Sequence, residues 1–337
     1  MKVTTIAPAN IAFIKYWSMK DPQLFIPNNN SISMTMSGCK TKTTVELTDN
    51  QDDLVEVKFF QSEYKKLDRK EIKQQNLFQQ IARIRTLSGG NQKVKVKSEN
   101  NFPSDAGIAA SASSFAALTA ALFLVYGLKD KFDDRKELSR QIRLCGSGSA
   151  VRSAMGGFVE FIAGHDHDSS YAKQIADEHH WDLVDVVAVV DSGKKKYGSS
   201  EGHKIASTSP YLATRLQEIK PRIKKVREAI SEKNLENLGP LIEADSTSMH
   251  AVMMTSKPPL FYWEPGTMRL MKDIISWREE DGLQAYFTID AGPNVHVICE
   301  KKDAKEVAKR LKVNPFVKST IYNEPCAGVR VSQDHLF

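Results

Sequence analysis

Two periods of apolar residues alternate along the 337-residue chain and divide it into strands and helices. Alternation at every second residue, which is typical of half-buried strands, predicts strands over 3–7, 41–47, 55–60 and 93–97. A helical spacing predicts a helix over 68–87, which interrupts them. The pattern then predicts an apolar helix ending at residue 125, a second helix near 134–144 and a strand near 157–162. No stretch of the chain repeats another.

The second half carries longer helical patterns. Residues 164–180 are charged and rich in histidine, which predicts an exposed linker or insertion. A buried strand is predicted over 183–191, followed by the loop GKKKYGSS. The remaining predicted elements are helices over 211–232, 235–254, 267–280 and 304–311, and strands over 284–290 and 295–300. This order predicts two α+β lobes with a cleft between them, an N-terminal lobe over 1–182 and a C-terminal lobe over 183–337.

Composition narrows the class of protein. The chain is 41% hydrophobic and 26% charged, and its longest apolar run, 115–125, is too short to cross a bilayer. Because the N-terminus lacks an apolar signal region, we expect a cytoplasmic protein without a membrane partner. The four cysteines lie far apart, without metal-ligand spacing, and are expected to be reduced.

Charge points to anionic small molecules. The formal net charge of +6 would suit nucleic acid or a site for polyanions. The lysines are scattered, however, and no repeated aromatic platform accompanies them, so we expect no nucleic-acid partner.

Residues 100–125, NNFPSDAGIAASASSFAALTAALFLV, join a turn of small residues directly to the apolar helix. Small side chains let backbone N–H groups approach an anion where the positive end of the helix dipole points at it. Ser111, Ser113 and Ser114 add hydroxyls suited to phosphate or Mg²⁺. The segment therefore predicts a phosphate site, although the same residues could serve only to pack the helix on a sheet. It contains neither GxxxxGK[ST] nor GxGxxG.

This turn, PSDAGIAAS, resembles the phosphate loop PxxxG[LI][AG][AS]S of the GHMP kinase superfamily. The blocks APANIAFIKYW, PNNNSISMT, CGSGSAVRSAMGGFVEF and YFTIDAGPNVHV resemble, in order, the mevalonate diphosphate decarboxylase branch. The resemblance implies a ribosomal-protein-S5-like N-terminal lobe, a ferredoxin-like C-terminal lobe, ATP and Mg²⁺, and a homodimer. The residues implied to bind ATP are Pro103, Ala106, Gly107, Ile108, Ala109, Ala110, Ser111, Ala112 and Ser113, with Ser111 also expected beside Mg²⁺.

Three charged residues are the candidate catalytic groups. Asp290 ends an apolar strand, and the resemblance implies that it accepts or orients the proton of the substrate's C3 hydroxyl. Lys15 is implied to neutralise charge as the γ-phosphoryl group arrives, and Arg152 to hold the C1 carboxylate with its guanidinium fork. Taken alone, Asp290 could cap its own turn, Lys15 could be a surface lysine stacked on an aromatic ring, and Arg152 could be solvated.

The remaining expected substrate contacts are Asn10, Tyr16, Ser147, Ser149, Ser199 and Ser200. Asn10 could instead only satisfy a nearby main-chain group. Two departures from the family concern the 5-diphosphate. The family reads IKYWGK where this chain has Met19, with Lys20 one step away, and it has an arginine in an SSRSGM-like loop where this chain has Ser200 in GSSEGH.

Each lost charge-assisted hydrogen bond costs about 1.5–3 kcal/mol, so these departures favour a phosphomevalonate decarboxylase that makes isopentenyl phosphate. Lys196 or Lys204 could compensate, which would keep diphosphomevalonate as the substrate. Other readings are a mevalonate 3-kinase-like enzyme that stops at the phosphorylated alcohol, and a GHMP-fold binding protein without catalysis.

Overall fold

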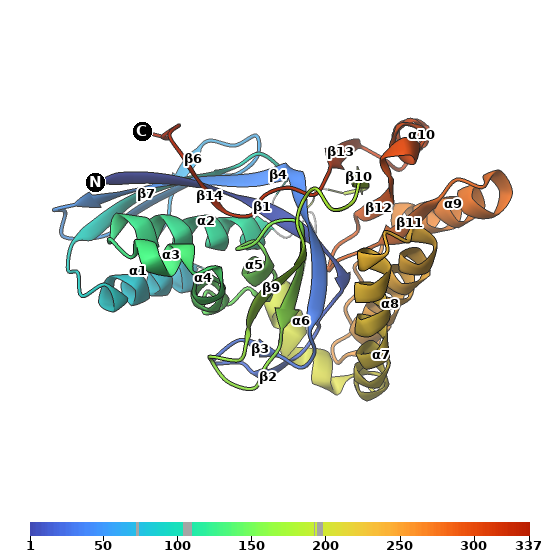
Figure 1. Cartoon of the computed structure of the whole chain (residues 1–337), viewed down its shortest axis with the longest axis horizontal. Helices are drawn as coiled ribbons and strands as arrows, with labels where there is room; N and C mark the ends of the chain where they lie inside the picture. Colours follow the sequence, from blue (N-terminus) through green and yellow to red (C-terminus); the bar gives the residue numbers. More distant parts are fainter. Residues whose placement is uncertain (72–73, 104–109, 192, 194–197) are drawn as a thin grey trace.

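The chain folds into two units of sheet and helix that lie side by side (Figure 1). The computed structural model describes residues 1–71, 74–103, 110–191, 193 and 198–337, the side chains of Gln75 and Ser200 excepted. The first unit is built on an eight-stranded sheet and the second on a four-stranded one. The fold is therefore α+β, as predicted.

The large sheet is assembled from both ends of the chain. Its spatial order is β14-β1-β4-β7-β5-β6, while β8 pairs with β4 and β9 with β8. Its strands are β1 (Lys2–Ile14), β4 (Ser31–Thr48), β5 (Leu54–Lys58), β6 (Tyr64–Lys66), β7 (Lys93–Asn100), β8 (Phe158–Ile162), β9 (Tyr171–Ala176) and β14 (Arg330–Ser332). A separate hairpin joins β2 (Met19–Asp21) to β3 (Ile26–Pro27).

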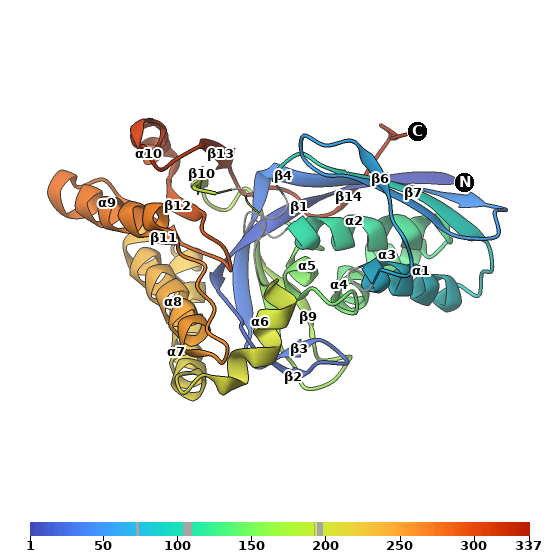
Figure 2. The same ribbon diagram turned by 180° about the vertical axis from the view of Figure 1, so that it is seen from behind.

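Helices cover one face of this sheet (Figure 2). They are α1 (Gln75–Leu87), α2 (Ala110–Val125), α3 (Lys129–Asp133), α4 (Arg135–Arg143) and α5 (Gly148–Arg152). α2 is buried almost all round, and its alanines allow a close approach to the sheet, where the Thr5 hydroxyl donates to Ala117 O at 2.7 Å. No helix within the described ranges is both long and apolar enough to cross a membrane.

The small sheet lies between two layers of helices. Its antiparallel order is β11-β12-β10-β13, with β10 (Leu183–Val189), β11 (Ala285–Thr288), β12 (Val295–Glu300) and β13 (Ser319–Asn323). The helices of this unit are α6 (Ser199–Ile205), α7 (Leu212–Ser231), α8 (Leu235–Thr255), α9 (Pro265–Asp281) and α10 (Lys301–Val313), with a 3₁₀ turn η2 (Ala206–Thr208). Along β10, Val184 and Val186 join the core under α9 and α10, whereas Leu183 and Val187 join the core that includes α7 and α8.

One of the hydrophobic clusters contains residues of both units. Ile11 and Phe13 of β1 lie in the same buried cluster as Ile219 of α7 and Ile242 of α8. The C-terminal end of β1 is thereby packed against the helices of the second unit.

Several predicted elements differ from the observed ones. The helix expected over 68–87 begins only at Gln75, because Asp68 instead closes a turn in which its carboxylate accepts from the Lys70 N–H at 2.9 Å. Residues 164–180 are not simply an exposed linker: β9 lies within them, pairs with β8 and buries Ala172. The segment GSSEGH, expected as a loop, is mostly helix α6.

Candidate active site

Lys15 and Asp290 meet where the two units touch. Lys15 directly follows β1, is only 3% exposed, and its Nζ donates to Ala12 O at 2.8 Å and to a carboxylate oxygen of Asp290. Asp290 lies two residues after β11, and its turn is closed by the Gly292 N–H donating to Asp290 O at 2.7 Å. Lys15 is therefore not a surface lysine, and the Asp290 carboxylate is used for an ion pair.

The environment of Asp290 keeps its carboxylate ionised. Burial on its own raises the pKa of Asp290, but the charge of Lys15, helped by His296 and Arg152, outweighs burial and holds the pKa below its ordinary value. The side chain is still 23% exposed. An ionised and accessible carboxylate can accept or orient a hydroxyl proton.

Arg152 is fixed by polar side chains of the large sheet. It is the last residue of α5 and is 3% exposed; its Nε donates to Asn10 Oδ1 at 3.1 Å and its Nη1 to the Ser31 hydroxyl at 2.6 Å. Asn10 in turn donates to Ser149 O at 3.0 Å and to Ser153 Oγ at 2.9 Å. Asn10, for which a substrate contact is predicted, is buried and holds Arg152 through its side-chain oxygen.

Tyr16 brings a fourth polar group toward the same place. Its ring stacks on His203 of α6, with centroids 4.7 Å apart and planes at 14°, and meets the edge of Phe161. The Gly148 N–H donates to the Tyr16 oxygen, and a Cβ on Gly148 would lie 2.1 Å from that oxygen. Burial raises the pKa of Tyr16, with Arg152 opposing it, so the phenol keeps its proton.

A chain of serine hydroxyls joins the helices α2 and α5. Ser111 Oγ, exposed in the first turn of α2, lies 3.2 Å from Ser147 Oγ, which lies 3.1 Å from Ser149 Oγ. Ser113, by contrast, is fully buried, and its hydroxyl contacts Thr41 Oγ1 at 2.6 Å. Of these two serines of α2, Ser111 is the one whose hydroxyl is accessible.

The other predicted ligand residues divide into three groups. Ala106, Gly107, Ile108 and Ala109 lie outside the described residues. Ala110 and Ala112 begin α2 as buried packing residues, and Pro103 precedes it half-buried. Ser199 and Ser200 are in α6, where Ser199 is exposed.

Several residues that sequence reasoning missed surround this cluster. His203 packs on Tyr16, and burial lowers its pKa to about 4. Asp245 and Ser246 of α8 contact the main chains of Lys15 and Ile289, and His250 contacts that of Asp290. No sequence signal marks the residues of α8, because this helix also carries polar residues on its exposed side.

Two surface cavities of about 510 Å³ lie elsewhere. One is lined mainly by β9 and the segment before β14, the other by Asn28, Asn29, Asn30 and α7. Neither is lined by Lys15, Arg152 or Asp290, so converging charge, and not cavity size, identifies the candidate site.

Family comparisons cover nearly the whole chain. Residues 7–172 match the family described as diphosphomevalonate decarboxylase-like N-terminal domain, and residues 185–331 match the mevalonate 5-diphosphate decarboxylase C-terminal domain. The chain is 33% identical over 344 residues to a diphosphomevalonate decarboxylase of Ganoderma lucidum, covering 96% of this chain and 84% of the relative. The human diphosphomevalonate decarboxylase is 34% identical over 313 residues, covering 87% and 75%.

Solved structures agree with the sequence comparison. Mevalonate diphosphate decarboxylase from Staphylococcus aureus superposes with a TM-score of 0.89 at 31% identity, over 98% of both chains. The enzyme from Enterococcus faecalis, described for its mevalonate diphosphate mediated ATP binding, gives 0.86 at 30% identity over 99% of both chains. A structure named MDDEF in complex with MVAPP, AMPPCP and magnesium gives 0.88 at 30% identity, again over 99% of both chains.

Proposed function

Since the chain belongs to the diphosphomevalonate decarboxylase family of the GHMP superfamily, we propose that it is an ATP-dependent carboxy-lyase of 5-phosphorylated mevalonate in isoprenoid biosynthesis. The favoured substrate is 5-diphosphomevalonate, which gives isopentenyl diphosphate, ADP, phosphate and CO₂. The relatives support this choice of substrate over the monophosphate that the sequence alone favoured. The observation that carries the proposal is the convergence of Lys15, Arg152 and Asp290 around one point.

Each charged group has a distinct task in this reaction. Asp290 accepts or orients the proton of the C3 hydroxyl while that oxygen attacks the γ-phosphorus of ATP. Lys15 offsets the negative charge that arrives with the phosphoryl group and keeps Asp290 ionised. When the C3 phosphate leaves, positive charge develops at C3, the C1 carboxylate departs as CO₂, and the double bond forms between C2 and C3.

Arg152 positions the carboxylate that is lost. Asn10 and Ser31 engage its Nε and Nη1, and no hydrogen bond to Nη2 is recorded among the described residues, so that nitrogen can hold one carboxylate oxygen. Burial lowers the pKa of Arg152, with Tyr16 and Asp290 opposing it, and an arginine still remains protonated near neutrality. Held through a single nitrogen, the carboxylate can still depart.

The start of α2 offers a suitable binding site for the nucleotide. The exposed Ser111 hydroxyl, with Ser147 and Ser149 behind it, offers oxygen donors and acceptors to a triphosphate. Mg²⁺ bound to the nucleotide neutralises phosphate charge and needs few protein ligands, and a serine hydroxyl suits it. We assign Ser111 as the protein oxygen nearest Mg²⁺.

The monophosphate remains a second candidate because of Met19. Met19 is half-buried in β2, and the adjacent Lys20 is exposed and donates its ammonium to Gly164 O. The pairing of β2 with β3 is irregular between Met19 and Asp21, so it is the contact of its ammonium with Gly164 O that keeps Lys20 from standing in for a lysine at position 19. Loss of a cation at this position weakens the binding of a 5-diphosphate more than the binding of a 5-monophosphate.

Other expectations remain proposals for this chain. We place the division between the lobes near residue 182, which lies between the two family matches, although β14 returns to the first sheet. We also propose that the protein is a cytoplasmic homodimer that binds neither nucleic acid nor membranes. Sedimentation of the purified protein would test whether it is a dimer.

The test is CO₂ release from purified protein with ATP and Mg²⁺, comparing 5-diphosphomevalonate, 5-phosphomevalonate and mevalonate. We expect CO₂ from the diphosphate with the highest kcat/KM. Higher kcat/KM for the monophosphate would establish the second candidate. ADP without CO₂ would make the protein a kinase, and no ADP with any substrate would support a binding protein without catalysis.

A further inference from the structure

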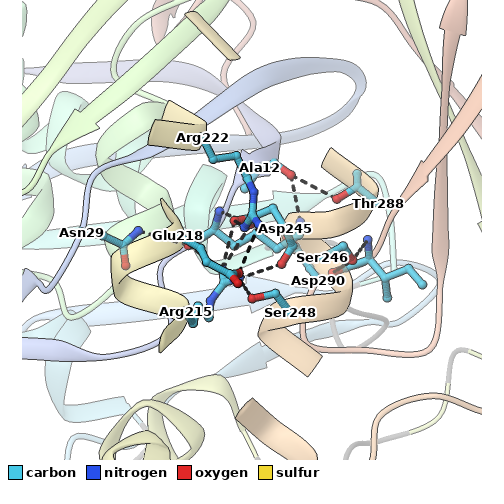
Figure 3. A network of polar contacts seen from close by, with 12 residues as sticks. Ala12, Asn29, Arg215, Glu218, Arg222, Asp245, Ser246, Ser248, Thr288 and Asp290 are labelled. Atoms are coloured by element: carbon cyan, nitrogen blue, oxygen red, sulfur yellow. Dashed lines mark hydrogen bonds and ion pairs between the residues drawn. The ribbon is translucent and has the colours of Figure 1, made fainter. Parts of the chain in front are cut away.

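We propose that α8 is a positioning element of the active site, in which Asp245 holds the main chain of Lys15 and Ser246 holds that of Ile289, the residue before Asp290 (Figure 3). This inference rests on the proposed function, and adds residues that touch neither substrate nor nucleotide. It starts from the fact that Lys15 and Asp290 are 275 residues apart in the chain and follow strands of different sheets.

Asp245 and its partner Arg215 together bind the main-chain N–H and C=O of Lys15. The Lys15 N–H donates to Asp245 Oδ2 at 2.8 Å. Arg215, which is paired with the same carboxylate at 3.2 Å, donates to Lys15 O at 3.0 Å. Arg222 adds a second guanidinium at 3.3 Å from Asp245 Oδ1. The donor and the acceptor of Lys15 are therefore both tied to one buried ion pair.

The next residue of α8 fixes the strand end that carries Asp290. The Ile289 N–H donates to Ser246 Oγ at 2.9 Å, and the Ser246 hydroxyl donates to Ile289 O at 3.1 Å. One turn later, His250 Nε2 donates to Asp290 O at 3.1 Å. Burial, with the charge of Lys15 adding to it, lowers the pKa of His250 to about 3, so the ring is a neutral donor beside the ammonium.

Stability alone does not account for this arrangement. Asp245 is fully buried and Arg215 is 3% exposed, and replacing such a pair by well-packed apolar residues is often neutral or stabilising. What apolar residues cannot do is fix a main chain by directed hydrogen bonds. A displacement of 1 Å at a reacting group can cost about 100-fold in rate, so a rigid common support for both residues has a direct effect on catalysis.

The test compares Asp245→Asn and Ser246→Ala with Glu243→Gln. Glu243 is a control on the same helix: its carboxylate binds Arg278 at 3.1 Å and accepts from the Phe287 N–H at 3.1 Å, within β11 and before the strand end that carries Asp290. We expect kcat for CO₂ release to fall about 10- to 100-fold in the first two variants. The KM values should stay within about threefold, and Glu243→Gln should keep kcat within about twofold at a similar loss of thermal stability.

Crystal structures of the three variants provide a readout that does not depend on turnover. We expect the Lys15–Asp290 contact to be lost or lengthened in Asp245→Asn and kept in Glu243→Gln. If Asp245→Asn does not fold, Ser246→Ala decides by the same two measurements. Equal loss of kcat in Ser246→Ala and Glu243→Gln, or an unchanged contact with unchanged kcat, would overturn the inference. Absence of CO₂ from the wild type, with the contact altered as expected, would instead overturn the proposed function alone.

Discussion

Replacing Lys15 with methionine keeps a side chain of similar length and removes the charge that faces Asp290. In the wild type, burial raises the pKa of Asp290, but Lys15, together with His296 and Arg152, holds that pKa below its ordinary value. In Lys15→Met, burial is no longer opposed by the ammonium, so the pKa of Asp290 should rise. The variant should lose both the ionised base and the cation that offsets phosphoryl charge.

The magnitude follows from the geometry of the pair. Removing one partner of a fully buried ion pair costs about 3–5 kcal/mol. Because the Asp290 side chain is 23% exposed, we expect a cost at or below the lower end of that range, about 2–3 kcal/mol at pH 7. Loss of a charge-stabilising group should lower kcat by at least about 100-fold.

The sign of the pH dependence is a stricter test. A depressed pKa for Asp290 stabilises the wild type above the unfolded pKa of about 4, and that contribution is lost as pH falls through the folded pKa. A raised pKa in Lys15→Met acts in the opposite direction. The difference in unfolding free energy between the wild type and Lys15→Met should therefore become smaller as the pH is lowered from 7 to 4.

Urea unfolding at both pH values, with Asp290→Asn and the double variant completing a mutant cycle, measures this coupling. The reasoning would be refuted if the wild type and Lys15→Met differed in unfolding free energy by the same amount at pH 7 and pH 4. A coupling energy between Lys15 and Asp290 below about 0.5 kcal/mol would also refute it. CO₂ release by the same variants separates the loss of stability from the loss of catalysis.

Three further predictions concern neighbouring features. Gly148→Ala should place a Cβ 2.1 Å from the Tyr16 oxygen, so the Tyr16 ring, which stacks on His203, would have to shift. Overpacking of about 1–3 kcal/mol should lower kcat/KM about tenfold, and Gly90→Ala, which meets first the flexible Ser88 hydroxyl, is the control. Met19→Lys should raise the ratio of kcat/KM for diphosphate over monophosphate by at least about tenfold, and an unchanged ratio would place the 5-phosphate end elsewhere. Glu160→Gln should weaken the buried carboxylate's contacts with Arg227 (2.7 Å) and Asn30 (2.7 Å), lowering the free energy of unfolding by about 1–3 kcal/mol with kcat kept; urea unfolding and CO₂ release measure the two.

Periodicity located the elements that are long enough to show it. The helices α7, α8 and α9 and the strands β10 and β12 fall where the pattern predicts them. The helices α5 and α6 span only five and seven residues, which is too few for an apolar period to emerge. β14 spans three residues and exists because β1 offers it a partner from the other end of the chain.

The candidate site was only partly accessible from sequence. Lys15 and Asp290 stand out because a charge interrupts or ends an apolar run, and the structure brings them into contact. Their catalytic roles, with that of Arg152, stay predictions. Asp245 gave no such signal, because an aspartate in a helix is normally solvated, and its contact with Lys15 joins residues 230 apart in the chain.

The return of β14 to β1 has a consequence for how the protein folds. Thr4 is in contact with His335, 331 residues away, and closing a flexible loop of that length costs about 5 kcal/mol. Three paired residues on each strand offer little against this cost until the intervening units have folded and brought the strands together. β14 should therefore dock late, and until then the edge of β1 is open to pairing with another chain. Refolding at high protein concentration should accordingly yield aggregates, and shielding this edge, rather than strengthening either core, should reduce them.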